Sequence, residues 1–215
     1  MTRIALIHAL AHSVEPINTA LARDWPEATR MNLLDDSLSA DLARGGQGLD
    51  AAMHERFQRL AQYALDSGAN GILFTCSAFG PCIEAVARRH PEVPVLKPNE
   101  AMVAEAAAGA GTLGLIATFE PTLSSMPAEF PDHVALDLDL ALAAGALEAL
   151  NEGDGARHDQ LIAAQAARLR ERGCTRIALA QFSMARARGA CEAASGLLVL
   201  TSVDSAVRRL HTRLS

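Results

Sequence analysis

One α/β pattern occurs twice in this chain, in two copies separated by about 105 residues. Each copy of its central segment reads as the end of a helix, a glycine, a short turn, a buried strand and a loop of small or polar residues. Three pairs of segments match in the same order: 3–7 with 112–116, 67–77 with 172–182, and 93–96 with 197–200. A repeat of this length indicates a duplicated α/β unit and not a short solenoid repeat.

Short apolar runs alternate with longer segments of helical periodicity in both copies, which is typical of βαβ units and a parallel sheet. We expect strands at 3–8, 28–33, 70–75, 93–96, 112–117, 133–138, 176–180 and 197–200. We expect helices at 49–66, 82–89, 100–108, 140–150, 157–172 and 203–213, and an irregular connection at 35–48. The predicted fold is α/β, with two similar flavodoxin-like parallel-sheet halves related by pseudo-twofold symmetry.

The two halves divide the chain of 215 residues into domains of ordinary size. No linker rich in Pro, Gly or Ser separates them, and the last strand–helix unit is expected to fold back onto the first half. We therefore predict a first domain of residues 1–98 plus 200–215 and a second domain of residues 99–199. Half of the residues are hydrophobic, so each half can bury a core.

Composition argues against several classes of partner. The formal net charge is −6 and no basic stripe is present, so we expect no nucleic-acid partner. The four cysteines have no CxxC spacing, which indicates neither a zinc site nor a disulfide framework. The first residues enter a strand-like run without a signal segment, and no apolar run is long enough to span a bilayer. We expect a reduced cytoplasmic protein without a membrane partner.

Ligands of open parallel sheets bind beyond the carboxyl ends of the strands, and this rule selects the candidate site residues. These residues are His8, His12, Ser13, Thr75, Cys76, Ser77, Lys97, Thr118, Glu120, Thr122, Gln181, Ser183, Thr201 and Ser202. Hydroxyl and amide groups that lead into helices suit a carboxylate, because helix N-termini present unpaired N–H donors. The loops contain neither a GxxxxGK nor a GxGxxG phosphate-binding motif, so nucleotide binding is unsupported.

The repeat places Cys76 and Gln181 at matching positions. If the two halves face each other, these side chains lie on opposite walls of one cleft. Cys76 stands at a strand end between Thr75 and Ser77, which favours a functional thiol over a core cysteine. The other cysteines, Cys82, Cys174 and Cys191, lie in or beside predicted helices and are expected to be structural.

Three motifs together resemble the aspartate/glutamate/hydantoin racemase superfamily. Segment 71–77, GILFTCS, resembles the first catalytic-cysteine motif of that superfamily. Segment 114–118, GLIAT, resembles its strand–Thr segment at the start of the second half, and 199–202, VLTS, resembles its last strand and loop. The resemblance extends over nearly the whole chain and includes the duplication.

The resemblance implies a cofactor-independent enzyme with its active site between two α/β halves. In the family, two cysteines flank the carbon next to a carboxylate, one thiolate removing the α-proton and the other thiol returning a proton. Carried over, Cys76 is the first cysteine, and Thr75, Ser77 and Thr118 help to hold the carboxylate of a small substrate. A thiol suits this chemistry because its unperturbed pKa, about 8.5, is close to neutral pH. A homodimer is the assembly that the family implies.

The chain departs from the family pattern at the second cysteine, where the matching loop has Gln181. An amide transfers no proton near neutral pH, and Ser183 is a weak substitute. Three functions therefore stay open. They are an isomerase or racemase that uses Cys76 as acid and base, a single-cysteine decarboxylase or cis–trans isomerase of the same superfamily, and a catalytically silent carboxylate-binding protein.

Other polar residues have simpler interpretations. His8 and His12 could bind a metal, but no third ligand lies nearby in the sequence, so we expect no metal site. His8, Ser13 and Thr201 are candidate substrate contacts because of their places after strands. Lys97, the single lysine, could neutralise a second carboxylate or be a solvated surface residue. Glu120 is expected to cap a helix that begins near Pro121.

Overall fold

A computed structural model describes residues 1–45, 48–135 and 137–215 of the chain. The described chain forms two compact units. Unit 1 consists of Met1–Pro98 and Ala206–Ser215, and unit 2 consists of Asn99–Ser205. Unit 2 is thus one continuous segment inserted into unit 1.

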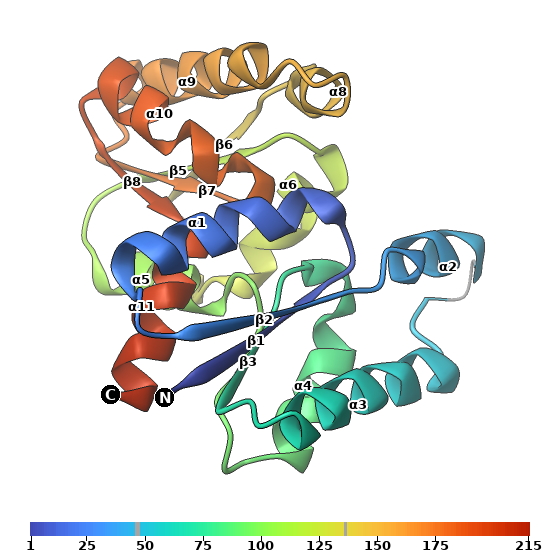
Figure 1. Cartoon of the computed structure of the whole chain (residues 1–215). Helices are drawn as coiled ribbons and strands as arrows, with labels where there is room; N and C mark the ends of the chain where they lie inside the picture. The colour runs from blue at the N-terminus through green and yellow to red at the C-terminus, as the bar shows by residue number, and fades with distance from the viewer. Residues whose placement is uncertain (46–47, 136) are drawn as a thin grey trace. The chain divides into compact units, whose positions relative to one another are not determined.

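Unit 1 contains a four-stranded parallel sheet in the order β2-β1-β3-β4 (Figure 1). Its strands are β1 (Arg3–His8), β2 (Thr29–Leu34), β3 (Gly71–Phe74) and β4 (Val95–Leu96). Its helices are η1 (Ala11–Ser13), α1 (Val14–Asp24), α2 (Ser37–Gly45), α3 (Ala51–Asp66), η2 (Ser77–Phe79), α4 (Gly80–Arg89) and the end of α11 (Ser202–Leu214).

The sheet of unit 1 is covered on both faces, as is usual for parallel sheets. Alternate strand residues such as Ile7 and Phe74 pack with Phe57 of α3 and with α4 on one face. Helix α1 lies against the other face (Figure 1), and Trp25 at its end contacts His211 of α11 with ring centroids 4.8 Å apart. At Gly71 a Cβ atom would come within 3.0 Å of Leu214, so the C-terminal helix approaches the backbone of β3 closely.

Unit 2 repeats this plan with the sheet order β6-β5-β7-β8. Its strands are β5 (Leu113–Ala117), β6 (Leu138–Leu142), β7 (Arg176–Leu179) and β8 (Leu198–Thr201). Its helices are α5 (Glu100–Ala108), α6 (Glu120–Ser125), η3 (Met126–Glu129), α7 (Asp132–Ala135), α8 (Ala146–Asn151), α9 (Gly155–Glu171), η4 (Phe182–Ala187) and α10 (Arg188–Ser195).

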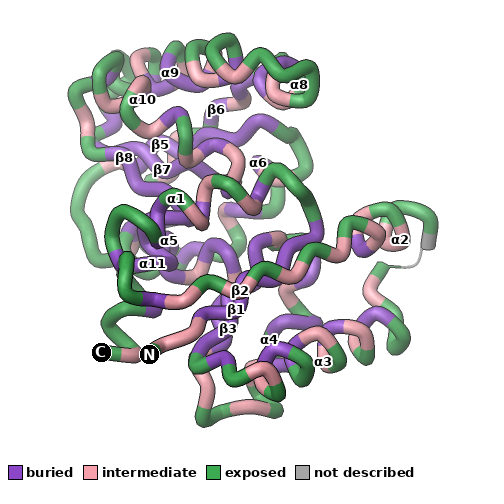
Figure 2. Tube along the Cα trace, in the orientation of Figure 1, coloured by how far each residue is buried: buried purple, intermediate pink, exposed green. Residues whose placement is uncertain are grey.

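Two cores lie on the two faces of the sheet of unit 2. Residues of α8, α9 and α10 pack on one face around Ile116 and Ile177. Residues of α5, α6 and η3 pack on the other face around Leu115 and Ala178. Figure 2 shows the resulting pattern of burial along the chain: most strands are largely buried, while the helices alternate between buried and exposed positions.

The strand registers of the two sheets match the sequence repeat. In unit 1, Ile4 pairs with Gly71, and in unit 2 Leu113 pairs with Arg176. The prediction of two similar parallel α/β halves is therefore confirmed. The pseudo-twofold relation between them stays a prediction.

Two details of the predicted secondary structure are wrong. We expect a strand at 133–138 and a helix at 140–150, but the chain forms α7, then β6 at Leu138–Leu142, and begins α8 only at Ala146. Residue 136 of the first range lies outside the described residues. Pro131 accepts a hydrogen bond from the N–H of Val134 and starts the turn of α7. Gly145, with φ +80°, separates β6 from α8 because it adopts the left-handed conformation that glycine tolerates.

The expected irregular connection at 35–48 contains a helix, α2. Leu38 and Leu42, four residues apart, both pack against the core of unit 1, which gives the segment an apolar helical face. Arg56 of α3 also binds Asp35 and Asp41 at 2.6 and 2.7 Å. Residues 46 and 47 of this prediction lie outside the described residues.

Candidate functional site

Cys76 is the second residue after β3 and the N-cap residue of η2, with φ −129° and ψ 120°. Helix α4 follows η2 directly and has Pro81 in its first turn. The thiol accepts a hydrogen bond from the backbone N–H of Ala78. Cys82, Cys174 and Cys191 are buried, whereas Cys76 is half-buried. Cys76 is therefore the cysteine that a small molecule can reach.

An apolar crevice of about 170 Å³ lies beside Cys76 within unit 1, and it has no room for a water molecule. The crevice is lined by Ile7, Ala9, Leu38, Phe57, Phe74, Cys76 and Phe79. Burial against these side chains raises the pKa of the Cys76 thiol, and the Ala78 N–H opposes this rise. At neutral pH Cys76 therefore holds its proton.

A chain of hydrogen bonds lies on the face of the sheet opposite this crevice. His8, which is fully buried, has Nδ1 at 3.0 Å from Thr75 Oγ1 and Nε2 at 3.0 Å from Asn32 Oδ1. Asn32 in turn forms a reciprocal amide pair with Asn18 of α1. Burial lowers the pKa of His8, so its imidazole is neutral at physiological pH.

The remaining candidates of unit 1 differ in their surroundings. Ser77 is exposed at the start of η2, Ser13 is buried at the end of η1, and His12 is exposed. Lys97 forms an ion pair with Glu84 at 2.7 Å, and this pairing lowers the pKa of the Glu84 carboxyl. Unit 1 thus brings His8 and Thr75 into contact on one face of the sheet, while Cys76 lines the crevice on the other face and Ser77 follows it in the chain.

Gln181 occupies the place in unit 2 that Cys76 has in unit 1, as the residue before a 3-10 helix at the end of its strand. Its Oε1 accepts hydrogen bonds from the N–H of Thr118 at 2.7 Å and from the Thr118 hydroxyl at 2.9 Å. These bonds fix the orientation of the amide, because only the oxygen can accept. The Gln181 NH₂ group is left as a donor, and Ser183 lies half-buried two residues further on.

Thr201 and Ser202 form the junction of β8 and α11. The Thr201 hydroxyl donates to Asp204 Oδ2 at 2.7 Å and accepts from the N–H of Asp204 at 3.0 Å. Arg188 also binds this carboxylate, at 3.1 Å. The Ser202 hydroxyl donates to Asn99 Oδ1 at 2.9 Å. The Thr201 hydroxyl thus caps the start of α11, as is typical of a helix N-terminus, while the Ser202 hydroxyl ties the same junction to Asn99.

Helix α6 begins at Glu120, so the residue at its N-cap position is Phe119 and not the expected Glu120. Thr122 lies half-buried within α6. Neither side chain joins the Thr118–Gln181 pair.

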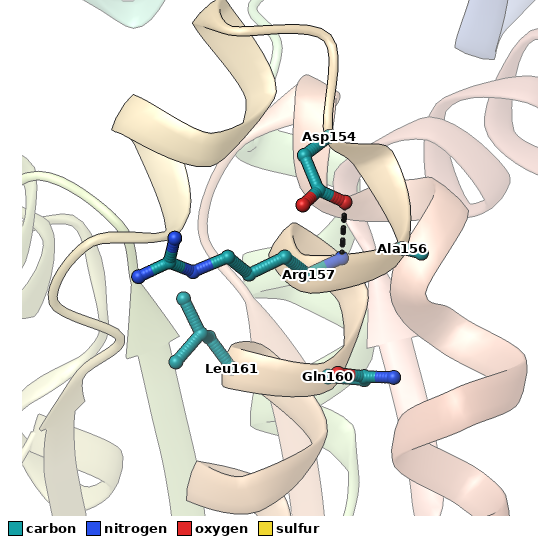
Figure 3. A pocket seen from close by; sticks show the side chains of 5 residues that line it. All are labelled: Asp154, Ala156, Arg157, Gln160 and Leu161. Atoms are coloured by element: carbon teal, nitrogen blue, oxygen red, sulfur yellow. Dashed lines mark hydrogen bonds between the residues drawn. The ribbon is translucent and has the colours of Figure 1, made fainter.

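A wide surface hollow of unit 2 lies over the start of α9 (Figure 3). It is lined by Asp154, Ala156, Arg157, Gln160 and Leu161. Asp154 is the N-cap residue of α9 and accepts a hydrogen bond from the N–H of Arg157 at 2.9 Å. The hollow contains no candidate residue from the sequence and is the surface of a capped helix.

Sequence reasoning missed Asn18, Asn32 and Asp204. Asn32 is a polar residue in an apolar strand, which is a weak signal without knowledge of its neighbour His8. Asp204 was visible as the fourth residue of a Thr-x-x-Asp pattern, which is a capping motif.

The described ranges contain neither a metal-binding group nor a membrane-spanning helix. Residues 1–45, 48–135 and 137–215 contain no group of three or more His, Cys, Asp or Glu side chains that could hold a metal ion. Within the same ranges, no helix combines the length and the apolar character needed to cross a bilayer.

Several solved racemase structures share this fold. An aspartate racemase homologue from Pyrococcus horikoshii OT3 superposes with a TM-score of 0.75 at 15% identity, covering 99% of each chain. Allantoin racemase from Klebsiella pneumoniae gives 0.71 at 17% identity, covering 99% of this chain and 87% of that one. Glutamate racemase from Thermus thermophilus gives 0.69 at 22% identity, covering 99% and 80%.

No curated protein sequence matches the chain. A family model, however, matches residues 9–210, which is nearly the whole chain, and its description is Asp/Glu/Hydantoin racemase. Its range includes Cys76, Gln181, the whole sheet of unit 2 and the sheet of unit 1 except β1. The chain therefore belongs to the Asp/Glu/hydantoin racemase family.

Proposed function

We propose that the protein catalyses cofactor-independent proton transfer at the α-carbon of a small carboxylate, with the Cys76 thiol as acid and base. Membership of a racemase family supports an isomerase-type enzyme. The observation that carries the proposal is the environment of Cys76, which is the one accessible cysteine among the four and stands at the carboxyl end of a central parallel strand. This edge of a parallel sheet is where ligands bind.

The proposed reaction moves one proton. The Cys76 thiolate takes the α-proton, the C–H electron pair passes into an enediolate on the carboxylate, and the new S–H bond holds the proton. Return of that proton to carbon restores the thiolate. Because burial raises the pKa of Cys76, the thiol form, which donates the proton to carbon, is present at neutral pH. The thiolate that removes the α-proton must therefore form on substrate binding or by prior deprotonation.

We assign the carboxylate to donors at the start of η2, where the exposed Ser77 hydroxyl lies beside Cys76. Backbone N–H groups at such a turn carry partial positive charge and suit an anion. Ser13 stays a candidate contact, and we propose that His8, which is fully buried with both ring nitrogens hydrogen-bonded, acts only indirectly. The hydroxyl hydrogens of Thr118 and Thr201 bind Gln181 and Asp204, so we propose that these threonines shape their strand ends and reach substrate only indirectly.

We propose that Gln181 is a neutral hydrogen-bond donor through its NH₂ group and not a proton carrier. Its oxygen is held by Thr118, which leaves the two amide hydrogens for an acceptor such as a carboxylate or enediolate oxygen. An amide has no proton to transfer, and Ser183 is the weaker candidate for that role. The wild-type enzyme is then expected to move protons on one face of the carbon.

Decarboxylation is the second candidate function, and two observations favour it. Gln181 removes the second thiol, and burial keeps the Cys76 thiol protonated. In such a reaction a substituted malonate loses CO₂, the C–C electron pair forms an enediolate, and the thiol gives its proton to carbon. The resulting thiolate then takes a proton from solvent.

The deciding experiment incubates the protein in D₂O with a panel of amino acids, hydantoins and substituted malonates. Nuclear magnetic resonance then follows α-deuterium incorporation, and chiral chromatography follows inversion. Exchange that depends on Cys76 supports the proposal, and CO₂ release from a malonate supports the second candidate. Binding without exchange, CO₂ release or inversion in any compound would favour a catalytically silent carboxylate-binding protein.

A further inference from the structure

Four polar side chains of unit 1, which we name the His8 network, lie behind the strand end that carries Cys76. They are Asn18 of α1, Asn32 of β2, His8 of β1 and Thr75 directly after β3. Thr75 is 4% exposed and His8 is fully buried, while Asn32 forms the exposed outer end. Buried polar groups are costly unless they are paired, so this network needs a reason.

The orientation of each member follows from the one before it. Asn18 Nδ2 lies 2.7 Å from the carbonyl oxygen of Val14, which can only accept, so the NH₂ group of Asn18 must face it. Asn18 Nδ2 also donates to Asn32 Oδ1 at 2.8 Å, and Asn32 Nδ2 donates back to Asn18 Oδ1 at 3.1 Å. The Asn32 oxygen is therefore the atom that faces His8.

This oxygen fixes the tautomer of His8. Asn32 Oδ1 can only accept, so His8 Nε2 carries the hydrogen across their 3.0 Å contact. The neutral ring then has a lone pair on Nδ1, which accepts the Thr75 hydroxyl hydrogen at 3.0 Å; the competing acceptor of that hydrogen, the Ile7 carbonyl oxygen, lies farther away at 3.4 Å. The backbone N–H of Thr75 also donates to the carbonyl of Ile7 at 3.0 Å. Thr75 is thus tied to β1 twice, immediately before the residue that carries the thiol.

Unit 2 shows that the fold itself does not need these groups. The strand registers make Ala117 the counterpart of His8, Leu140 the counterpart of Asn32, and Ala180 the counterpart of Thr75. All three counterparts are aliphatic. The strand end that carries a thiol has the polar network, and the strand end that carries an amide does not.

We propose that His8 is a positioning residue for Cys76: held as the Nε2–H tautomer by Asn32, it accepts the Thr75 hydroxyl hydrogen and fixes the end of β3 from which the thiol projects. That this positioning serves proton transfer by Cys76 rests on the proposed function. The network acts through the backbone, because His8 and Thr75 lie on the opposite face of the sheet from the crevice that Cys76 lines.

The first test gives unit 1 the residues of unit 2 in one variant, His8→Ala/Asn32→Leu/Thr75→Ala. The variant should fold, because unit 2 carries the same residues at the same register positions. We expect α-proton exchange to fall about 10–100-fold with little change in KM, as for a misplaced reacting group. We also expect iodoacetamide to alkylate Cys76 faster at pH 8, because the released thiol leaves its apolar crevice.

Single substitutions separate positioning from general stability. Thr75→Ser keeps the hydroxyl and should retain both the exchange rate and the alkylation rate. Thr75→Val keeps the branched shape and removes the hydroxyl, so it should move both rates in the same direction as the triple variant. Thr29→Val, at the start of β2 on the other side of β1, is the control and should change neither rate.

Side-chain ¹⁵N spectra test the tautomer directly, with His8→Ala identifying the signal. Wild type and Thr75→Ser should show the Nε2–H form. Asn32→Leu should show the Nδ1–H form, because Nδ1 then donates to Thr75 while Nε2 has lost its acceptor. An unchanged Nε2–H form in Asn32→Leu would contradict the orientation argument.

The proposal is overturned if folded Thr75→Val and the folded triple variant alkylate and exchange at wild-type rates. Alkylation and the ¹⁵N spectra require no substrate, so they judge the network even if wild type exchanges none of the compounds offered. In that case the proposed function would fail, while faster alkylation in both variants would still show that the network positions the thiol.

Discussion

Unit 1 and unit 2 have the same strand order and the same register, but their strand ends carry different chemistry. In unit 1 a half-buried thiol, Cys76, is supported from behind by His8 and Thr75. In unit 2 an amide, Gln181, anchors itself to Thr118, and the positions behind it are aliphatic. The comparison teaches that the sheet supplies the position of the loop, while a few side chains decide what the loop can do.

The difference also concerns protons. The Cys76 thiol can give and take a proton, whereas Gln181 can only donate and accept hydrogen bonds. A duplicated scaffold with one proton carrier is expected to be asymmetric in its chemistry. Substitutions that erase or reverse this asymmetry are therefore the most informative.

The largest expected effect comes from removing the thiol. In Cys76→Ser the hydroxyl keeps the size of the side chain, but its pKa lies far above the working range. Exchange of the α-proton should fall by about 10²–10⁴-fold, the usual contribution of a general acid–base group. Deuterium incorporation measures the rate, and Cys174→Ser, which changes a buried cysteine of unit 2, is the control. Full turnover in Cys76→Ser would reject the mechanism.

The second substitution gives unit 2 the thiol of unit 1. In Gln181→Cys a second proton carrier stands at the position equivalent to Cys76, so the ratio of inversion to exchange should rise. Wild type should exchange faster than it inverts. Chiral chromatography in D₂O measures both rates. If wild type already inverts as fast as it exchanges, Ser183 or a histidine supplies the second proton, and the claim that Gln181 leaves the enzyme with one proton carrier is wrong.

A third prediction concerns the buried thiol of unit 2. Burial, with smaller contributions from Asp159 and Glu192, raises the pKa of Cys191 to about 12. The unfolded chain loses this proton near pH 8.5, so the stabilisation is complete below that pH and is lost as pH rises toward 12. The free energy of unfolding should fall by up to ~1.4 kcal/mol per pH unit for this thiol.

Urea denaturation between pH 8 and pH 10 measures this slope. Cys191→Ala should have a shallower slope than wild type, even if its stability at pH 7 is lower because of the cavity. Equal slopes would show that the buried thiol ionises normally in the folded state.

The smallest expected effect concerns the anchor of Gln181. Thr118→Val removes the hydroxyl hydrogen bond but keeps the backbone N–H bond to Oε1. The free energy of unfolding should fall by about 0.5–1.5 kcal/mol, the net contribution of one hydrogen bond. Thermal denaturation measures the change, with Thr122→Val as the matched control. A loss no larger than that of the control would mean that the backbone bond alone holds Gln181.

The repeat predicted much of this arrangement, because buried parallel strands keep a recognisable apolar sequence. It placed Cys76 and Gln181 at equivalent positions, and the registers of β3 and β7 agree. Their predicted facing arrangement across one cleft stays a prediction of the repeat. Segment 133–142 was harder to interpret, because short apolar runs suit both helix and strand.

The His8 network could not have been predicted from sequence. The two residues that bind His8, Asn32 and Thr75, lie 24 and 67 residues from it, and no local motif connects them. Only the pairing of β1 with β2 and with β3 brings Asn32 and Thr75 to the same imidazole. The direction of each hydrogen bond follows from the geometry of the amides, which sequence does not contain.

The insertion of unit 2 into unit 1 has a consequence for synthesis on the ribosome. The sheet of unit 1 is complete once β4 has emerged, but Ala206–Ser215, which includes the partner of Trp25, follows only after all of unit 2. The nascent first unit must therefore remain without the part of its core that Ala206–Ser215 supplies while the second unit is translated. Translation speed and chaperone supply during that interval should influence the yield of active protein, even for variants whose final stability is unchanged.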